Sequence, residues 1–302
     1  MRRGAGSVLV MLAAVCWGLA GAIGGVLMAD GWSPFVLAFY RGAIGLGIVL
    51  IWLATHSGQS GLGDPRLWLW SLLAGLGITG NFSFYFLSIE AGSVAVAATL
   101  MYCAPVFVYL TAFTLKLERP TPLKCGAIVA VMIGVALLTQ IHKVGPAGVS
   151  SFSIGTGLLA GISYAIFIFA FKNAADRGSP QAILVIAFGV LVALLFWPAD
   201  GGQMSAALHS PKWPLFALLG IVGAGFSFFI YIVGIHYTTP TIASVVAMLE
   251  PVIAVASGML VLGETLSAEQ LVGMVLILVT ATGLSLRSAA ANESPGERSS
   301  ER

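Results

Sequence analysis

The chain repeats itself with a constant shift of 146 residues. Each half contains five hydrophobic segments, and five is an odd number. The second copy must therefore enter a bilayer from the opposite side, as in the inverted-topology repeats from which many secondary transporters are built. The residues that coincide at this shift include Asp30 and Asp176, Ser33-Pro34 and Ser179-Pro180, Gly77 and Gly223, Phe82 and Phe228, Tyr85 and Tyr231, Pro105 and Pro251, and Glu118 and Glu264.

The composition places this repeat in a membrane. Of the 302 residues 58% are hydrophobic and only 9% are Asp, Glu, Lys or Arg, whereas soluble domains carry about 25% charged residues. A water-soluble fold of this size could not bury so much apolar surface, so we expect an all-α, multi-pass membrane protein. A β-barrel is excluded because its strands would be about 10 residues long with alternating polarity. The net charge of +2 is too small to suggest nucleic acid as a partner.

Ten apolar windows are long enough to cross the hydrocarbon core, which takes about 20 helical residues. The windows lie near 7–29, 34–54, 67–89, 93–115, 125–141, 152–171, 180–199, 213–236, 240–262 and 270–286. We therefore expect a first five-helix repeat over residues 1–141 and an outer linker over 142–151. A second repeat follows over 152–287, and a disordered cytoplasmic tail over 288–302.

The positive charges predict the orientation, because cytoplasmic loops are enriched in Lys and Arg. With the N-terminus in the cytoplasm, the outer loops hold only Lys143 and Lys212. Both termini are then cytoplasmic, Glu118 lies in an inner loop and its repeat partner Glu264 in an outer loop. The inner loops and tails hold Arg2, Arg3, Arg66, Lys116, Arg119, Lys124, Lys172, Arg177, Arg287, Arg298 and Arg302.

Two charged residues lie inside predicted spans, Arg41 in the second and Glu250 in the ninth. An ionisable group at the centre of a membrane helix costs at least ~2.5–3.5 kcal/mol, so such residues are candidates for function. Glu250 could take up a proton or bind a substrate amine, and Arg41 could bind a substrate carboxylate. The alternatives are that both only satisfy partners within the bundle, and that Arg41 extends outward to the interface.

Pro105 and Pro251 interrupt the fourth and ninth spans at equivalent positions. A proline removes one backbone donor and frees a carbonyl one turn earlier, and such groups are tolerated in membranes where they are buried or line a cavity. Breaks at matching positions of the two repeats indicate a binding site between them. A simple packing kink is the alternative.

Polar and aromatic side chains follow helical faces in several spans, and we expect them to form a central cavity rather than to face lipid. For any one of them, ordinary interhelical packing is the alternative. These candidates are Trp17, Asn81, Tyr85, Thr99, Tyr102, Ser163, Tyr164, Ser227 and Tyr231.

Glycine spacing also predicts two close helix crossings. Gly21 with Gly25, and Gly157 with Gly161, form the GxxxG pattern that lets helices approach closely. No metal-ligand spacing, paired cysteines or nucleophile motif is apparent in the sequence. We therefore expect neither a cofactor nor a metal, and no enzymatic activity.

Several motifs resemble the EamA family of the drug/metabolite transporter superfamily over residues about 7–287. The resemblance rests on Leu249-Glu250-Pro251-Val252, Leu262-Gly263-Glu264 with Leu266-Ser267, Ala104-Pro105-Val106 with Lys116-Leu117-Glu118-Arg119, Cys16-Trp17-Gly18 and Phe39-Tyr40-Arg41. It implies a ten-helix carrier that exports amino acids and related metabolites, or sometimes drugs. The first half departs from the pattern because Ala104 stands where the second half has Glu250.

Three functions remain in competition. The first is export of small metabolites, amino acids foremost, by alternating access at a midplane cavity of the bacterial inner membrane. The second is efflux of drugs or lipophilic cations. The third is a membrane sensor or assembly subunit. The expected partners are a small-molecule substrate and the bilayer, with the protein acting as a monomer or homodimer. Two buried charges favour a small zwitterion over a dianionic substrate.

Overall fold

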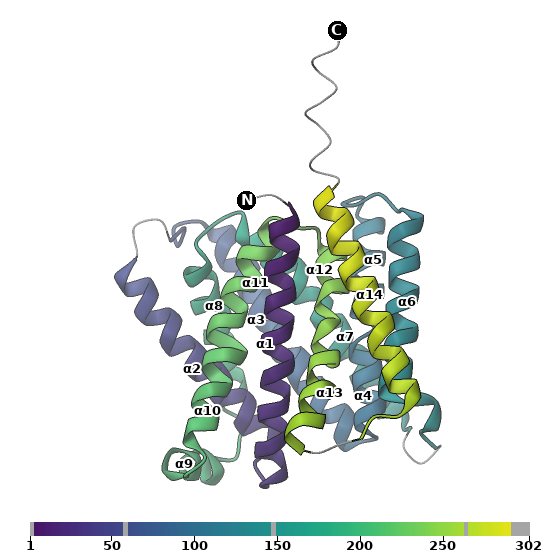
Figure 1. Cartoon of the computed structure of the whole chain (residues 1–302). Helices are drawn as coiled ribbons and strands as arrows, with labels where there is room; N and C mark the ends of the chain where they lie inside the picture. Colours follow the sequence, from purple (N-terminus) through teal and green to yellow (C-terminus); the bar gives the residue numbers. More distant parts are fainter. Residues whose placement is uncertain (1–2, 57–59, 146–148, 263–264, 291–302) are drawn as a thin grey trace.

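A computed structural model describes residues 3–56, 60–145, 149–262 and 265–290 of the chain, and this part is helical without β-strands. The helices stand side by side in one bundle (Figure 1). They are α1 (Arg3–Ala29), α2 (Pro34–Thr55), α3 (Pro65–Glu90), α4 (Val94–Met101), α5 (Ala104–Thr114), α6 (Pro122–Thr139), η2 (Ile141–Lys143), α7 (Ser151–Ala175), α8 (Pro180–Leu195), α9 (Gly201–His209), α10 (Trp213–Gly220), η4 (Ile221–Phe226), α11 (Ser227–His236), α12 (Pro240–Ala247), α13 (Leu249–Leu262) and α14 (Ala268–Ala290).

The chain is an all-α, multi-pass membrane protein. In the described residues nine helical segments are long and apolar enough to cross a bilayer, and α8 is a shorter apolar helix at the predicted position of the seventh span. The seventh span was expected over 180–199, but α8 ends at Leu195. Pro198 follows, and a helix cannot easily continue into a proline. The chain then forms the short helix α9, which the sequence did not predict.

Prolines and capping side chains determine where several of the spans begin. Proline stands in the first turn of α2, α3, α6, α8 and α12, where its missing N–H costs nothing. A side-chain oxygen of the preceding residue caps several of these helices. Asp64 accepts from the Arg66 backbone N–H, Thr121 from Lys124 N–H, and Thr239 from Ile242 N–H.

Three spans are interrupted. The fourth divides into α4 and α5 before Pro105, and the ninth divides into α12 and α13 before Pro251. These two breaks lie at equivalent positions of the repeat. The eighth span contains a π-helical turn, η4, between α10 and α11. Such turns are rare and occur often at functional sites.

Equivalent helices of the two repeats pack antiparallel against each other. At the shift of 146 residues, α6 corresponds to α14. A Cβ atom on Gly134 would lie 3.0 Å from the backbone oxygen of Gly273. Gln140 at the end of α6 donates to Ser267 at the start of α14, with 2.7 Å between Nε2 and Oγ. Two equivalent spans that run in opposite directions require an inverted repeat, with its two-fold axis in the membrane plane.

The same symmetry relates other contacts. Ser88 of α3, in the first repeat, donates from its hydroxyl to the backbone oxygen of Ser153 of α7, in the second repeat, over 2.7 Å. At the equivalent place in the second repeat, Gly234 of α11 lies against Gly6 of α1, where an added Cβ would meet backbone at 2.8 Å. Each repeat therefore packs its first helix against the third span of the other repeat.

The start of α1 and the end of α14 lie at the same end of the bundle (Figure 1). Glu118 is described, but its repeat partner Glu264, expected in an outer loop, lies outside the described residues. α14 continues to Ala290, beyond the expected boundary at 287, and residues 291–302 of the expected tail lie outside the described residues too. The exact repeat boundaries remain a prediction.

The crossing of α6 and α14 predicts a specific stability effect. We expect Gly273→Leu to destabilise the protein by about 1–3 kcal/mol, as overpacking does, because a Cβ there would lie 2.6 Å from the Gly134 carbonyl oxygen. Gly283→Leu on the same helix is the matched control, since nothing lies within 4 Å of its Cβ position. Thermal unfolding of the purified protein in detergent measures both, and equal melting temperatures would contradict this crossing.

Candidate functional site

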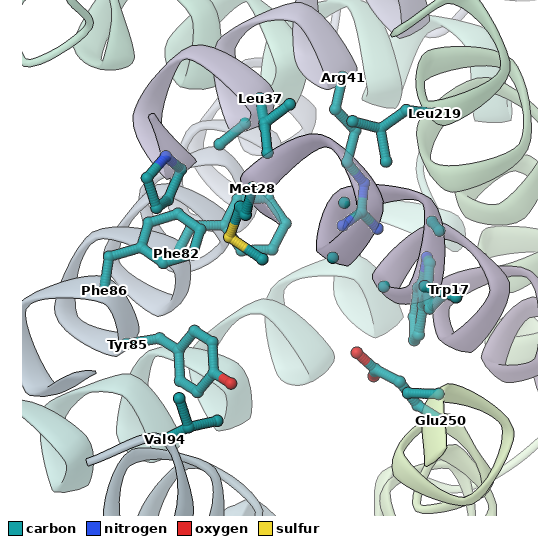
Figure 2. A pocket seen from close by; sticks show the side chains of 18 of the residues that line it. Trp17, Met28, Leu37, Arg41, Phe82, Tyr85, Phe86, Val94, Leu219 and Glu250 are labelled. Atoms are coloured by element: carbon teal, nitrogen blue, oxygen red, sulfur yellow. The ribbon is translucent and has the colours of Figure 1, made fainter. Parts of the chain in front are cut away.

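A cavity of about 440 Å³ lies within the bundle. It is lined by α1, α2, the later part of α3, α4 and its end, α10 and α13 (Figure 2). Its lining residues are Trp17, Ala20, Gly21, Ala22, Gly24, Gly25, Met28, Pro34, Leu37, Ala38, Arg41, Asn81, Phe82, Tyr85, Phe86, Val94, Met101, Tyr102, Leu219, Glu250, Ala254, Val255 and Gly258.

The lining of the cavity reaches one end of the bundle. Its outermost lining residues include Met28 near the end of α1, Pro34 at the start of α2 and Val94 at the start of α4. We call this the open end. At the opposite, closed end, Ser7 of α1 meets Thr238 with 3.4 Å between their hydroxyl oxygens.

Further contacts seal the closed end. Lys172 of α7 donates to the carbonyl oxygens of Ile235 and His236 at the end of α11, at 3.0 and 2.6 Å. Glu118 accepts a hydrogen bond of 3.1 Å from the backbone N–H of Thr241 in the first turn of α12. A cation near a helix C-terminus and an anion near an N-terminus both interact favourably with the helix dipole.

Arg41 does not extend to the interface. Its Nε donates to the backbone oxygen of Gly223 over 2.8 Å, and its Cζ lies 5.1 Å from the centre of the Phe82 ring. Gly223 belongs to the π-helical turn η4. Figure 2 shows the guanidinium group pointing into the cavity, so its terminal N–H groups face that space.

Glu250 occupies the first turn of α13, where the helix dipole favours a negative charge. The hydroxyl of Tyr164 lies 3.5 Å from its Oε2. Figure 2 shows the Glu250 carboxylate, the Tyr85 hydroxyl and the Arg41 guanidinium directed toward the same space. Among the described residues no ion pair joins Arg41 to Glu250, so the cavity presents a cationic and an anionic group separately.

This arrangement suits a small ligand that carries both charges. A guanidinium binds a carboxylate through two parallel hydrogen bonds, and a carboxylate accepts from an ammonium. The rest of the wall is aromatic or aliphatic, with Asn81 and Tyr85 as neutral polar groups. The described residues contain no cluster of three or more His, Cys, Asp or Glu that could hold a metal ion.

The structure brings most of the predicted site residues together. Seven of them line this cavity or the small pocket behind it, in which Tyr164, Phe167 and Phe228 approach Glu250. These seven are Trp17, Arg41, Asn81, Tyr85, Tyr102, Tyr164 and Glu250.

Four other candidates lie outside this cavity in the structure. Thr99 bonds to Thr139 over 2.6 Å and joins α4 to α6. Ser163 is buried against Gly80. Ser227 and Tyr231 are completely buried, and the Tyr231 ring packs on Trp17 with 5.0 Å between centroids. Trp17 thus lies between Tyr231 and the cavity.

The two prolines do not line the cavity either. Pro105 is buried in the first turn of α5, and Pro251 adjoins Glu250 in the first turn of α13. Their contribution to the site is therefore indirect. Each proline follows a break in its span and stands in the first turn of the helix that begins after the break. For Pro251 that break puts Glu250 in the first turn of α13.

Sequence reasoning missed the cavity's glycines and two of its phenylalanines. Gly24 and Gly25 have nothing within 4 Å of an added Cβ, so they create space rather than a crossing. The GxxxG expectation thus fails for Gly25 and holds for Gly161, whose Cβ would meet the Leu100 backbone at 2.7 Å. Phe82 and Phe86 also line the cavity. The repeat supplies a signal for Gly25, because Phe171 stands at the equivalent position.

Comparisons with known proteins agree with this architecture. The model of the EamA-like transporter family matches residues 4–140 and again residues 151–286. One solved crystal structure is similar over 97% of this chain and 100% of its own chain. The TM-score is 0.76 at 18% sequence identity. At that identity the likeness concerns the fold alone.

Three curated relatives illustrate the range of similarity. An uncharacterised transporter of Archaeoglobus fulgidus is 31% identical over 64% of this chain and 68% of that protein. The threonine/homoserine exporter RhtA of Escherichia coli K12 is 26% identical over 71% and 70%. The uncharacterised inner membrane transporter YicL of Salmonella typhimurium is 24% identical over 94% and 96%.

The open space beside Gly25 predicts that a large side chain there closes the cavity. With the native cysteines replaced, a Tyr85→Cys variant reports access through its reaction rate with a charged thiol reagent. We expect Gly25→Phe to slow this reaction by about tenfold or more, because a close-packed wall excludes the reagent. Gly47→Phe on α2 is the control, since its Cβ position is also open but outside the cavity. An unchanged rate in Gly25→Phe would contradict the assignment.

Proposed function

The chain belongs to the EamA-like transporter family, and on that premise we propose that it exports small zwitterionic metabolites, amino acids foremost, by alternating access. The observation that carries the proposal is the pair of opposite charges in one aromatic cavity. Arg41 and Glu250 both line it. An α-amino acid offers a carboxylate to the first and an ammonium to the second.

The partners of Arg41 support this role. Its hydrogen bond to Gly223 uses Nε, which leaves the terminal N–H groups for a ligand carboxylate. Hydrogen bonds with an ionised partner contribute about 1.5–3 kcal/mol each. The RhtA relatives, which are named threonine/homoserine exporters, add support for amino acids, at 26% identity.

Efflux of lipophilic cations is the second candidate, and the aromatic wall favours it. Trp17, Phe82 and Tyr85 all line the cavity beside Glu250, and cations bind to aromatic faces. Arg41 opposes this function because its fixed positive charge repels a cation in the same space. A zwitterion satisfies both charges, so we favour it.

For the orientation, we propose that the closed end faces the cytoplasm. Both termini then lie on the cytoplasmic side of a bacterial inner membrane. The support is the distribution of positive charge. The open end carries Lys143 and Lys212, the latter paired with Asp30 at 3.0 Å. The closed end carries Arg66, Lys116, Arg119, Lys124, Lys172, Arg177 and Arg287.

Fusions to the C-terminus test this orientation. We expect green fluorescent protein attached after Arg302 to fluoresce and alkaline phosphatase at the same place to be inactive, because the phosphatase folds only outside the cytoplasm. Fluorescence and phosphatase activity are compared between colonies that express the two fusions at the same level. An active phosphatase with a dark fluorescent fusion would reverse the proposed topology.

Uptake into proteoliposomes tests the substrate. The panel contains threonine, homoserine, leucine and phenylalanine, with tetraphenylphosphonium as the lipophilic cation, each measured with and without a pH gradient. We expect saturable uptake of at least one amino acid. Uptake of the cation alone would replace our proposal with the second candidate.

Glu250→Gln, measured in the same assay, tests the role of the acid. The variant keeps the shape and hydrogen bonding of Glu250 but cannot exchange a proton. We expect transport to fall about 10- to 100-fold, the equivalent of one charge-assisted hydrogen bond, and its response to a pH gradient to disappear. Wild-type rates with the same pH dependence would show that Glu250 only holds helices together.

A further inference from the structure

The repeat relates part of the cavity wall to residues that are buried elsewhere. Asn81 and Tyr85 line the cavity from α3. At the shift of 146 residues, Ser227 and Tyr231 of α11 take their positions. Both lie in the second repeat, and neither reaches the cavity in this structure.

Ser227 and Tyr231 are buried without hydrogen bonds from their side chains. Both are completely buried, and their hydroxyl oxygens have no hydrogen-bond partner in the part of the chain that the structure describes. A buried hydroxyl without a partner is unfavourable, and within a native fold it calls for an explanation. The repeat supplies an explanation. Ser227 and Tyr231 are equivalent to Asn81 and Tyr85, whose side chains line the cavity.

Two phenylalanines pack where the open half of the cavity has glycines. Phe167 and Phe171 are the repeat partners of Gly21 and Gly25. Their ring centroids lie 6.2 and 6.1 Å from that of Tyr231. The same face of the symmetric scaffold is therefore open in the first repeat and filled with aromatic rings in the second.

We propose that Ser227 and Tyr231 are substrate contacts of the other half of the pathway, which is covered in this state and exposed when the closed end opens. This inference rests on the proposed transport function. When the two repeats exchange conformations, the Asn81 and Tyr85 face closes and the Ser227 and Tyr231 face opens. The ligand is the same small zwitterion, which meets hydroxyl and aromatic groups in either state.

The charged groups do not exchange in this way. The repeat partners of Arg41 and Glu250 are Ala187 and Ala104, and both alanines are completely buried. The other half of the pathway therefore offers no equivalent charges. Arg41 and Glu250 hold the charged ends of the substrate in both states, while the neutral contacts change from α3 to α11.

The closed end offers a way to shift the equilibrium between the two states. Lys172 bonds to two carbonyl oxygens at the end of α11, and Glu118 bonds to the start of α12. The first contact joins two helices of the closed end, and the second joins the segment between α5 and α6 to α12. Lys172→Met and Glu118→Gln weaken them independently, far from the cavity.

Cysteine accessibility in detergent tests the inference without any substrate, so a wrong substrate assignment does not affect it. The background replaces Cys16, Cys103 and Cys125. Into it we introduce Tyr85→Cys or Tyr231→Cys, and measure the reaction rate with a charged methanethiosulfonate reagent. Ile277→Cys, at a completely buried position between α14 and α6, reports loss of the fold.

We expect Tyr85→Cys to react and Tyr231→Cys to be protected. Adding Lys172→Met should raise the rate at position 231 by about tenfold, the equivalent of one lost charge-assisted hydrogen bond, while the rate at position 85 falls only slightly because the open state stays the major one. Glu118→Gln should act in the same direction. Position 277 should stay protected throughout.

Two results would overturn the inference. One is a rise at position 231 together with a rise at position 85, because a single pathway cannot open to both ends. The other is protection of position 231 in both weakened variants, because another face would then line the opened half. A variant in which position 277 reacts is unfolded, and the second weakened variant then decides between the two outcomes.

Discussion

The cavity depends on the hydrogen bond between Arg41 and the carbonyl of Gly223. A guanidinium within a membrane bundle costs several kcal/mol unless it is bonded, and its partner here is backbone. That carbonyl belongs to the π-helical turn η4, and such turns occur often at functional sites. Gly223 is also small enough for the guanidinium to approach, since an added Cβ would lie 3.0 Å from Nε. One local irregularity thus stabilises a buried cation and aims it into the cavity.

The difference between the repeats explains which end is open. Both halves have the same scaffold, yet Gly21 and Gly25 of α1 correspond to Phe167 and Phe171 of α7. Phe167 and Phe171 pack with Trp17, Phe228 and Tyr231 at centroid distances of 6.0 to 6.4 Å. Aromatic pairs of this geometry stabilise beyond their buried area. These rings are packed in the structure described, and in it the cavity lies at the glycine side.

The sequence predicted the architecture better than the site, for physical reasons. Apolar length and turn residues place the spans, because both are local properties. The breaks before Pro105 and Pro251 follow in the same way. The sequence did not reveal η4, since no local signal distinguishes a π-turn in an apolar segment from a regular helix. Nor did the sequence reveal that Tyr85 lines the cavity while Tyr231 is buried. The two tyrosines occupy equivalent positions of the repeat, and only the first lies in the half of the scaffold that is open.

The scaffold is symmetric but its buried charges are not, and this difference determines how tightly the charged ends of a substrate are held. In the proposed mechanism the two repeats exchange conformations, and the pathway faces each end in turn. If Arg41 and Glu250 had charged counterparts at positions 187 and 104, the substrate would meet a second pair of charges and could be held too tightly to leave. With Ala187 and Ala104 there, the charges are concentrated at one place. Affinity for the charged ends of a substrate then stays nearly constant between the two states. A ligand with equal affinity for both states shifts neither, which is the condition under which a carrier can release what it has bound on the other side.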